Sequence, residues 1–359
     1  MTTPAAAPAG PAAAPADPTA APTDPAAAPT HPADAASVPA PAEQQRQIGI
    51  WGAPESGKST FLSSLFIATT RATERVTVRG NDAKSTDFLI TNTNLMQNHE
   101  FPPPTVFRAK LSWTLQMWVP NTARRSLRRF WRRRPSRVPF DFNVEIQDAG
   151  GLDFGPEPQG SNRLDISGER TEDIATYLRR CQGLLIIIDP LREREVGDAY
   201  RFFFGPLLRM AEAQSLPLPH YVAVCVTKFD HPRVFDFAQY YGYLSYRLDD
   251  PEYMPCVHPD AAERFIRHLF QDPLFQEHPT NEVEMVIGGL RQYFRPERVK
   301  YFISSAVGFY IDPMEPFDED HYMNVSENAT GHKIVGAVRP INVIEPLVWL
   351  GERLAAGEP

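Results

Sequence analysis

Residues 52–59 read GAPESGKS and match the pattern G-x-x-x-x-G-K-[ST]. The segment follows an apolar stretch, Gln47 to Trp51, that is typical of a short buried strand, and it precedes a stretch, 58–71, with the apolar spacing of a helix packed on a sheet. A tight turn between a strand and a helix aims successive backbone N–H groups at one point. The segment therefore predicts an anion site for a polyphosphate within an α/β fold.

Two side chains of this loop have predicted roles toward a nucleoside triphosphate. Lys58 would reach the β- and γ-phosphates, and the Ser59 hydroxyl would ligate Mg²⁺. The other predicted contacts of the loop with the nucleotide are Gly52, Glu55, Ser56, Gly57 and Thr60. The side chains of Pro54 and Glu55 donate no hydrogen bond to phosphate.

A second motif follows the predicted strand 139–147. Asp148-Ala149-Gly150-Gly151 fits D-x-x-G, in which Asp148 at the strand end reaches Mg²⁺ through water and the Gly151 N–H meets the γ-phosphate. These two residues, with Lys58 and Ser59, complete a predicted phosphate and metal site.

Two further motifs point to the base. Thr227-Lys228-Phe229-Asp230 follows a β-branched run at 220–227 that is typical of an inner parallel strand. An Asp230 carboxylate can accept hydrogen bonds from the N1–H and the exocyclic amine of guanine, and the Lys228 stem can lie along the base. Ser304-Ser305-Ala306 ends a predicted strand at 299–304, where a backbone N–H of Ser305 or Ala306 would meet the guanine O6. The pattern favours guanine over adenine.

Alternating strands and helices predict a three-layer α/β fold, a mostly parallel sheet with helices on both faces. The expected strands are 47–51, 106–119, 139–147, 184–189, 220–227 and 299–304. The expected helices are 58–71, 168–181, 194–214, 260–271, 280–294 and 341–354, with an irregular or helical stretch at 82–98. Ligands of such sheets bind at the carboxyl ends of the strands, where all four motifs fall.

With these motifs in this order, the chain from about residue 45 resembles the P-loop GTPases of the Ras-like, translation-factor-related superfamily. The resemblance implies GTP and GDP as ligands with Mg²⁺, guanine selection by Asp230, and a molecular switch. Thr227 stands where the superfamily more often has Asn. The Ile50-Trp51-Gly52 opening and the insertions are similar to the bacterial double-GTPase group. A threonine that closes over Mg²⁺ is expected at Thr105, with Thr91 and Thr93 as alternatives.

The largest departure from that superfamily lies after D-x-x-G, where Leu152 replaces the glutamine that orients the attacking water. We therefore expect slow intrinsic GTP hydrolysis, with the missing group supplied by Asp153, Glu157 or Gln159 or by a protein partner, an activator or an effector encoded in the same operon. The alternative is a non-hydrolysing, nucleotide-bound scaffold that assembles with membrane or protein partners. An ATPase is a third interpretation, which the motif at 227–230 opposes.

Residues 1–44 are predicted to form a disordered tail. They are almost wholly Ala, Pro and Thr without Lys or Arg, and such a segment buries too little apolar area to offset its ordering entropy. It lacks the pattern of a secretory signal. The expected GTPase domain spans 45–359, with insertions at about 230–297 and 307–340. No apolar run reaches membrane-spanning length, and Cys181, Cys225 and Cys256 are typical of reduced core thiols, so we expect a cytoplasmic protein.

A run of eight arginines without an acid occupies Arg124–Arg137, although the whole chain has a formal net charge of −8. Its place between two antiparallel strands predicts a hairpin, 120–138, whose tip is remote from the nucleotide. Three interpretations stay open: a solvated tip, docking to an anionic membrane surface with Phe130 and Trp131 as anchors, or contact with nucleic acid or an acidic protein patch. Membrane docking would make the protein peripheral at the inner membrane surface.

Overall fold

The structure is a computed structural model of the chain, and part of the chain is described by it. The described residues are 46–72, 75–103, 110–120, 137–147, 168–196, 199–247, 250, 252–273, 275, 282–328 and 331–357. All of them belong to one unit, Gln44–Pro359. The predicted tail lies outside the described residues.

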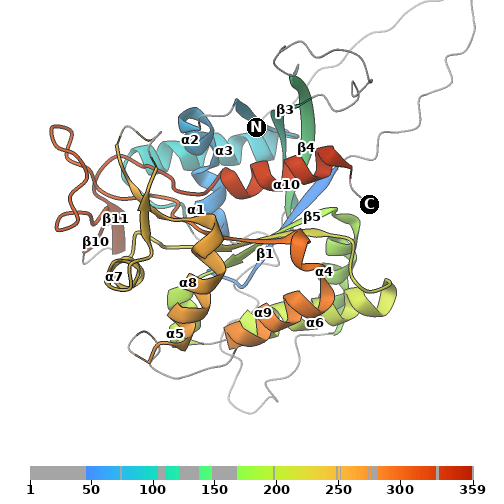
Figure 1. Ribbon diagram of the computed structural model, residues 1–359. Helices are drawn as coiled ribbons and strands as arrows, with labels where there is room; N and C mark the ends of the chain where they lie inside the picture. Colours follow the sequence, from blue (N-terminus) through green and yellow to red (C-terminus); the bar gives the residue numbers. More distant parts are fainter. Residues whose placement is uncertain are drawn as a thin grey trace, which may run out of the picture. The chain divides into compact units, whose positions relative to one another are not determined.

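Helices and strands alternate along most of the described chain (Figure 1). In chain order they are β1 (Gln47–Gly52), α1 (Lys58–Ser63), α2 (Leu65–Arg71), β2 (Val76–Gly80), α3 (Ala83–Gln97), β3 (Lys110–Pro120), β4 (Arg137–Gln147), α4 (Gly168–Arg180), β5 (Gly183–Ile188), α5 (Pro190–Glu195), α6 (Ala199–Ala213), β6 (Tyr221–Val226), α7 (Pro232–Tyr240), β7 (Leu244–Tyr246), β8 (Pro255–Val257), α8 (Pro259–Gln271), α9 (Glu282–Tyr293), the 3-10 turn η3 (Pro296–Arg298), β9 (Val299–Ile303), β10 (Val325–Asn328), β11 (Gly331–Ile334) and α10 (Glu345–Ala356).

Seven described strands form the central sheet in the order β2-β3-β4-β1-β5-β6-β9. Strands β4, β1, β5, β6 and β9 are parallel, and β3 and β2 continue the sheet antiparallel. The carboxyl ends of β1, β5, β6 and β9 therefore meet at one edge, as the sequence motifs require. Pro120 and Arg137, which belong to the predicted arginine hairpin, 120–138, pair with each other at the opposite end of β4.

Two hydrophobic cores, one on each face of the sheet, explain the continuous apolar runs of β5 and β6. In β5, Leu184 and Ile186 point into one core and Leu185 and Ile187 into the other, because side chains alternate along a strand. Helices α4, α6, α8 and α9 cover the first face, and α1, α3 and α10 cover the second (Figure 1). The predicted three-layer α/β fold is confirmed.

Several predicted elements have different bounds. The helix expected at 58–71 is interrupted at Ser64, where the hydroxyls of Ser63 and Ser64 bond the carbonyl oxygens of Ser59 and Phe61 and compete with the helical backbone. The helix expected at 194–214 is two helices, and the first begins earlier, at Pro190. Strand β2 has no counterpart among the predicted strands.

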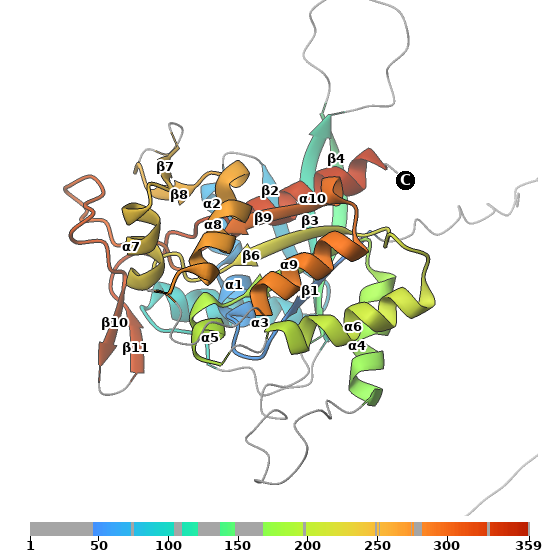
Figure 2. The same cartoon turned by 60° about the horizontal axis from the view of Figure 1, so that its bottom comes forward.

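The insertion at 230–297 packs on the sheet rather than forming a separate lobe. Phe265 of α8 and Leu290 of α9 belong to the same core as Val224 of β6. Hairpin β10–β11 lies beside α7 in both ribbon views (Figures 1 and 2). There the rings of Phe235 and Tyr322 have centroids 4.3 Å apart.

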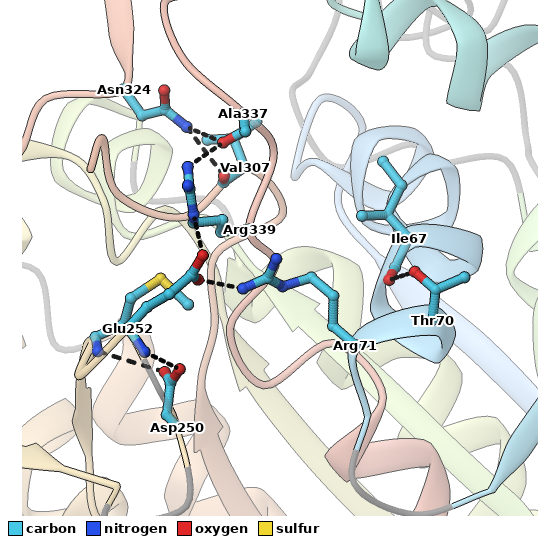
Figure 3. A network of polar contacts seen from close by, with 10 residues as sticks. Ile67, Thr70, Arg71, Asp250, Glu252, Val307, Asn324, Ala337 and Arg339 are labelled. Carbon is cyan, nitrogen blue, oxygen red and sulfur yellow. Dashed lines mark hydrogen bonds and ion pairs between the residues drawn. The ribbon is translucent and has the colours of Figure 1, made fainter. Parts of the chain in front are cut away.

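A polar network connects the two insertions to α2, the second helix after the loop at 52–59 (Figure 3). Glu252 accepts from Arg71 at the end of α2 and from Arg339, whose Nε lies 2.9 Å from Glu252 Oε1. Asn324 donates to the carbonyl oxygens of Val307 and Ala337, both at 3.1 Å. Helix α2 and both insertions therefore share one set of charged contacts.

Candidate functional site

The loop between β1 and α1 has a backbone that depends on two glycines. A side chain at Gly52 would place its Cβ 2.5 Å from the carbonyl oxygen of Ile187 and 2.8 Å from Ser56 Oγ, so only glycine fits there. Gly57 is the residue before α1 and has φ +87°, a left-handed conformation that glycine adopts without strain. The turn of the loop is thus fixed by the residues that the motif specifies.

Lys58 and Ser56 place polar groups inside this loop. Lys58 Nζ donates to the carbonyl oxygens of Gly52, at 3.1 Å, and Ala53, at 2.7 Å, so the ammonium group lies across the start of the loop. Ser56 Oγ is buried and has no hydrogen-bond partner among the described atoms. A buried hydroxyl without a partner costs free energy, and an oxyanion ligand would satisfy it. Both groups fit a polyphosphate.

Thr227 connects this loop to the end of β6. Its backbone N–H donates to the carbonyl oxygen of Ile188. Its hydroxyl lies 3.2 Å from the same oxygen and 3.4 Å from the carbonyl oxygen of Ser56. The first and third motifs, 171 residues apart in the chain, are therefore in direct contact.

Asp230 and Ser305 are also brought together. The Ser305 hydroxyl donates to Asp230 Oδ1 and accepts from the backbone N–H groups of Val307 and Gly308. Asp230 is half-buried, and burial raises the pKa of its carboxyl, while the hydrogen bond from Ser305 opposes that rise. Ala306 follows Ser305 and is partly exposed.

Asp189, at the end of β5, holds Lys228 in place. Lys228 Nζ lies 2.6 Å from Asp189 Oδ2. The other carboxylate oxygen accepts from the N–H groups of Leu191, at 2.9 Å, and Arg192, at 3.4 Å, and so caps α5. Sequence reasoning missed Asp189, although an Asp-Pro pair after an apolar run is a helix-start signal.

Left-handed backbone is concentrated at this edge of the sheet. Glu55 and Lys228 have φ of 61° and 59° although neither is glycine. Asn342, with φ 50°, donates its side-chain amide to the carbonyl oxygen of Ile303, at the end of β9. Such conformations cost about 1–3 kcal/mol each and persist where surrounding structure holds them, which is common at binding sites.

Several predicted site residues lie outside the described residues, namely Thr105, Asp148, Gly151 and Leu152. The arginine run lies outside them too, except for Arg137. Of the alternatives to Thr105, Thr93 is buried with its hydroxyl 3.2 Å from the Ser63 carbonyl oxygen, so it packs between α3 and α1, while Thr91 is exposed on α3.

The described residues meet the requirements of neither a metal site nor a membrane-spanning helix. Among the described side chains, no group of three or more His, Cys, Asp or Glu residues is placed to hold a metal ion. Of the predicted Mg²⁺ ligands, only Ser59 is described, in the first turn of α1. None of the helices in those ranges has both the length and the apolar character that crossing a bilayer requires. Cys181, Cys225 and Cys256 are free and buried.

No protein-family model and no curated protein matches this chain. Solved structures with some likeness include the signal recognition particle receptor SRb-GTP/SRX complex from Chaetomium thermophilum, at 10% identity and a TM-score of 0.32, over 75% of this chain and 93% of that one. Sup35 complexed with GDP is 12% identical, with a TM-score of 0.26, over 79% of this chain and 46% of that one. The bacterial selenocysteine-specific elongation factor EF-Sec is 11% identical, with a TM-score of 0.20, over 55% of this chain and 23% of that one. The function proposed below rests on the residues of the site alone.

Proposed function

We propose that this protein binds guanine nucleotides and acts as a molecular switch that hydrolyses GTP slowly to GDP and phosphate, with stimulation by a protein partner. One observation carries the proposal. The hydroxyl of Thr227 lies between the carbonyl oxygens of Ser56 and Ile188, so the loop suited to polyphosphate, after β1, and the motif suited to guanine, after β6, meet across the end of β5 at one edge of the sheet.

At the phosphate end, Lys58 would exchange its two carbonyl contacts for phosphate oxygens. The ammonium group makes charge-assisted hydrogen bonds to either acceptor, but a phosphate oxygen also carries negative charge that attracts it, so this exchange favours the bound state. Ser56 Oγ would gain the partner that it lacks among the described atoms. Bound Mg²⁺ would neutralise charge on the phosphates, with Ser59 as one ligand and with Thr105 and Asp148 as further proposed ligands.

At the base end, Asp230 would accept from N1–H and the 2-amino group of guanine. The Ser305 hydroxyl would keep donating to a remaining lone pair of this carboxylate and hold its orientation. The Lys228 stem would lie along the base while its ammonium group stays with Asp189. Adenine has no donor pair at this edge, so the arrangement favours GTP and GDP over ATP and ADP.

For hydrolysis, Leu152 offers no group to orient water, and this favours slow turnover and a partner that supplies the missing group. Leu152 also favours a second candidate function, a nucleotide-bound scaffold that does not hydrolyse GTP. Phosphate release measured with and without candidate partners separates the two.

Equilibrium titration with fluorescent GDP, GTP and ADP tests the proposal. The wild-type chain should bind both guanine nucleotides and exclude ADP. Lys58→Ala should weaken GDP binding at least tenfold, since it removes charge-assisted contacts of about 1.5–3 kcal/mol each. The matched control is Lys84→Ala, an exposed lysine on α3, which should leave binding unchanged. Equal binding by wild type and Lys58→Ala would refute the phosphate assignment.

A change of base preference tests Asp230 separately. In xanthine a carbonyl replaces the 2-amino group, and an asparagine amide can donate to it. Asp230→Asn should therefore lose affinity for GDP and gain affinity for xanthosine diphosphate. A variant that keeps its preference for GDP would show that Asp230 does not read the base.

A further inference from the structure

Glu55 and Arg192 form an ion pair at the phosphate loop. Arg192 Nη1 lies 3.3 Å from Glu55 Oε2, across 137 residues of sequence. The Arg192 side chain is 18% exposed and that of Glu55 is 80% exposed. The carboxylate therefore stands in solvent on the loop, and the guanidinium group lies beneath it against the protein.

A carboxylate in this loop opposes the ligand proposed for it. A nucleoside diphosphate or triphosphate has several negative charges, and like charges repel more strongly as water is excluded from between them. Glu55 lies three residues before Lys58, whose ammonium group is the proposed phosphate contact. Without compensation, Glu55 would speed the release of any nucleotide held by the loop.

Arg192 is anchored where it can provide that compensation. Its backbone N–H donates to Asp189, which is 3% exposed at its side chain and also pairs with Lys228. Lys228 follows Thr227, which contacts the carbonyl oxygen of Ser56. The ion pair thus closes a ring of contacts that runs from the loop through β6 and α5 and back to the loop.

We propose that Arg192 is a positioning residue for nucleotide retention, which neutralises Glu55 and so slows the release of the bound nucleotide. This inference rests on the proposed guanine nucleotide binding. Arg192 acts through Glu55 rather than by binding phosphate itself, so the effect of removing Arg192 should depend on the charge of Glu55.

The experiment measures release of fluorescent GDP from the full chain after addition of excess unlabelled GDP. The proteins compared are the wild type, Arg192→Ala, Glu55→Gln and the double variant. Arg192→Ala should release GDP about 3- to 10-fold faster, a modest factor because Glu55 is exposed and screened. In the Glu55→Gln background, the same change should alter the rate by less than about twofold.

Two further readouts separate neutralisation from a structural role. Arg192→Lys keeps the positive charge and should restore slow release. Raising the salt concentration to about 1 M should shrink the effect of Arg192→Ala, because screening then acts within roughly 3 Å. Arg192→Gln takes the place of Arg192→Ala if thermal unfolding shows that the alanine variant is not folded.

Equal acceleration by Arg192→Ala in the wild-type background and in the Glu55→Gln background would overturn the inference, since Arg192 would then contact the nucleotide directly. Unchanged release from Arg192→Ala would overturn it as well. Failure of the wild-type chain to bind GDP is a different result, which would remove the proposed function first.

Discussion

The hydroxyl of Thr227 lies 3.4 Å from the carbonyl oxygen of Ser56 and 3.2 Å from that of Ile188. One side chain at the end of β6 thereby contacts both the loop after β1 and the end of β5. The side chain is buried, and its neighbours Lys228 and Asp230 face the other polar groups of the site. A change at Thr227 therefore acts on the loop and on the base motif together.

Thr227→Val should weaken GDP binding by about 3- to 10-fold and lower the free energy of unfolding by about 1 kcal/mol, because it removes the hydroxyl and leaves two buried carbonyl oxygens with one partner fewer. Thr227→Asn keeps a donor and should bind GDP nearly as well as wild type. The matched control is Thr77→Val on the exposed side of β2, which should change neither quantity. Equal loss in the valine and asparagine variants would show that the hydrogen bond does not matter.

The affinity for GDP should fall at acidic pH, and the fall should begin at a higher pH than it would for an aspartate with an ordinary pKa. Burial raises the pKa of Asp230, so the nucleotide-free folded protein favours the protonated carboxyl, whereas the proposed complex needs the ionised one. Binding then releases a proton, and affinity is full above the raised pKa and is lost as pH falls through it. Titrations from about pH 4 to 7 measure this. An affinity that stays flat over this range would contradict the role of Asp230.

Gly308 and Gly242 make a matched pair for the cost of backbone crowding. They have φ of +69° and +68°, but a Cβ at Gly308 would lie 1.8 Å from the carbonyl oxygen of Arg339, whereas nothing lies within 4 Å of one at Gly242. Gly242→Ala should cost about 1–2 kcal/mol, from left-handed strain alone. Gly308→Ala should cost at least about 2 kcal/mol more, because backbone has to move. Urea unfolding measures the loss of unfolding free energy in both variants. Equal losses would show that the backbone of the insertion at 307–340 moves to accommodate the new methyl group with little loss of stability.

Sequence patterns predicted β5 and β6 well because these two strands are buried on both faces and therefore read as unbroken apolar runs, as in 184–188. Strand β2 was missed because it is a short edge strand. Only Val76 and Val78 alternate there with polar residues, and its place depends on antiparallel pairing with β3. The start of α5 was missed because the apolar run was extended through Asp189, which the fold uses as a helix cap.

Some residues of the candidate site were predicted from the sequence, and others were found only in the structure. Motif spacing pointed to Gly52, Gly57, Lys58 and Asp230 because these positions depend on local loop geometry or on a fixed offset from a strand. It did not point to Arg192, whose contact with Glu55 depends on how β5 and β1 pair in the sheet. Long-range ion pairs leave no periodic signal in a sequence, so only the fold reveals them.

Glu252 should contribute more to stability than a typical surface acid, because it holds two arginines (Figure 3). The Arg339 side chain is 12% exposed. Removal of the Glu252 carboxylate would therefore leave a mostly buried guanidinium group without this partner. Glu252→Ala should lower the free energy of unfolding by about 1–3 kcal/mol, whereas the exposed control Glu297→Ala should change it by less than about 0.5 kcal/mol. Arg71→Ala should cost less than Glu252→Ala, because Arg71 is 36% exposed and water replaces part of its contact. Urea unfolding with an unchanged m-value measures all three, and a Glu252→Ala midpoint equal to that of the control would show that α2 and the two insertions are held together by apolar packing alone.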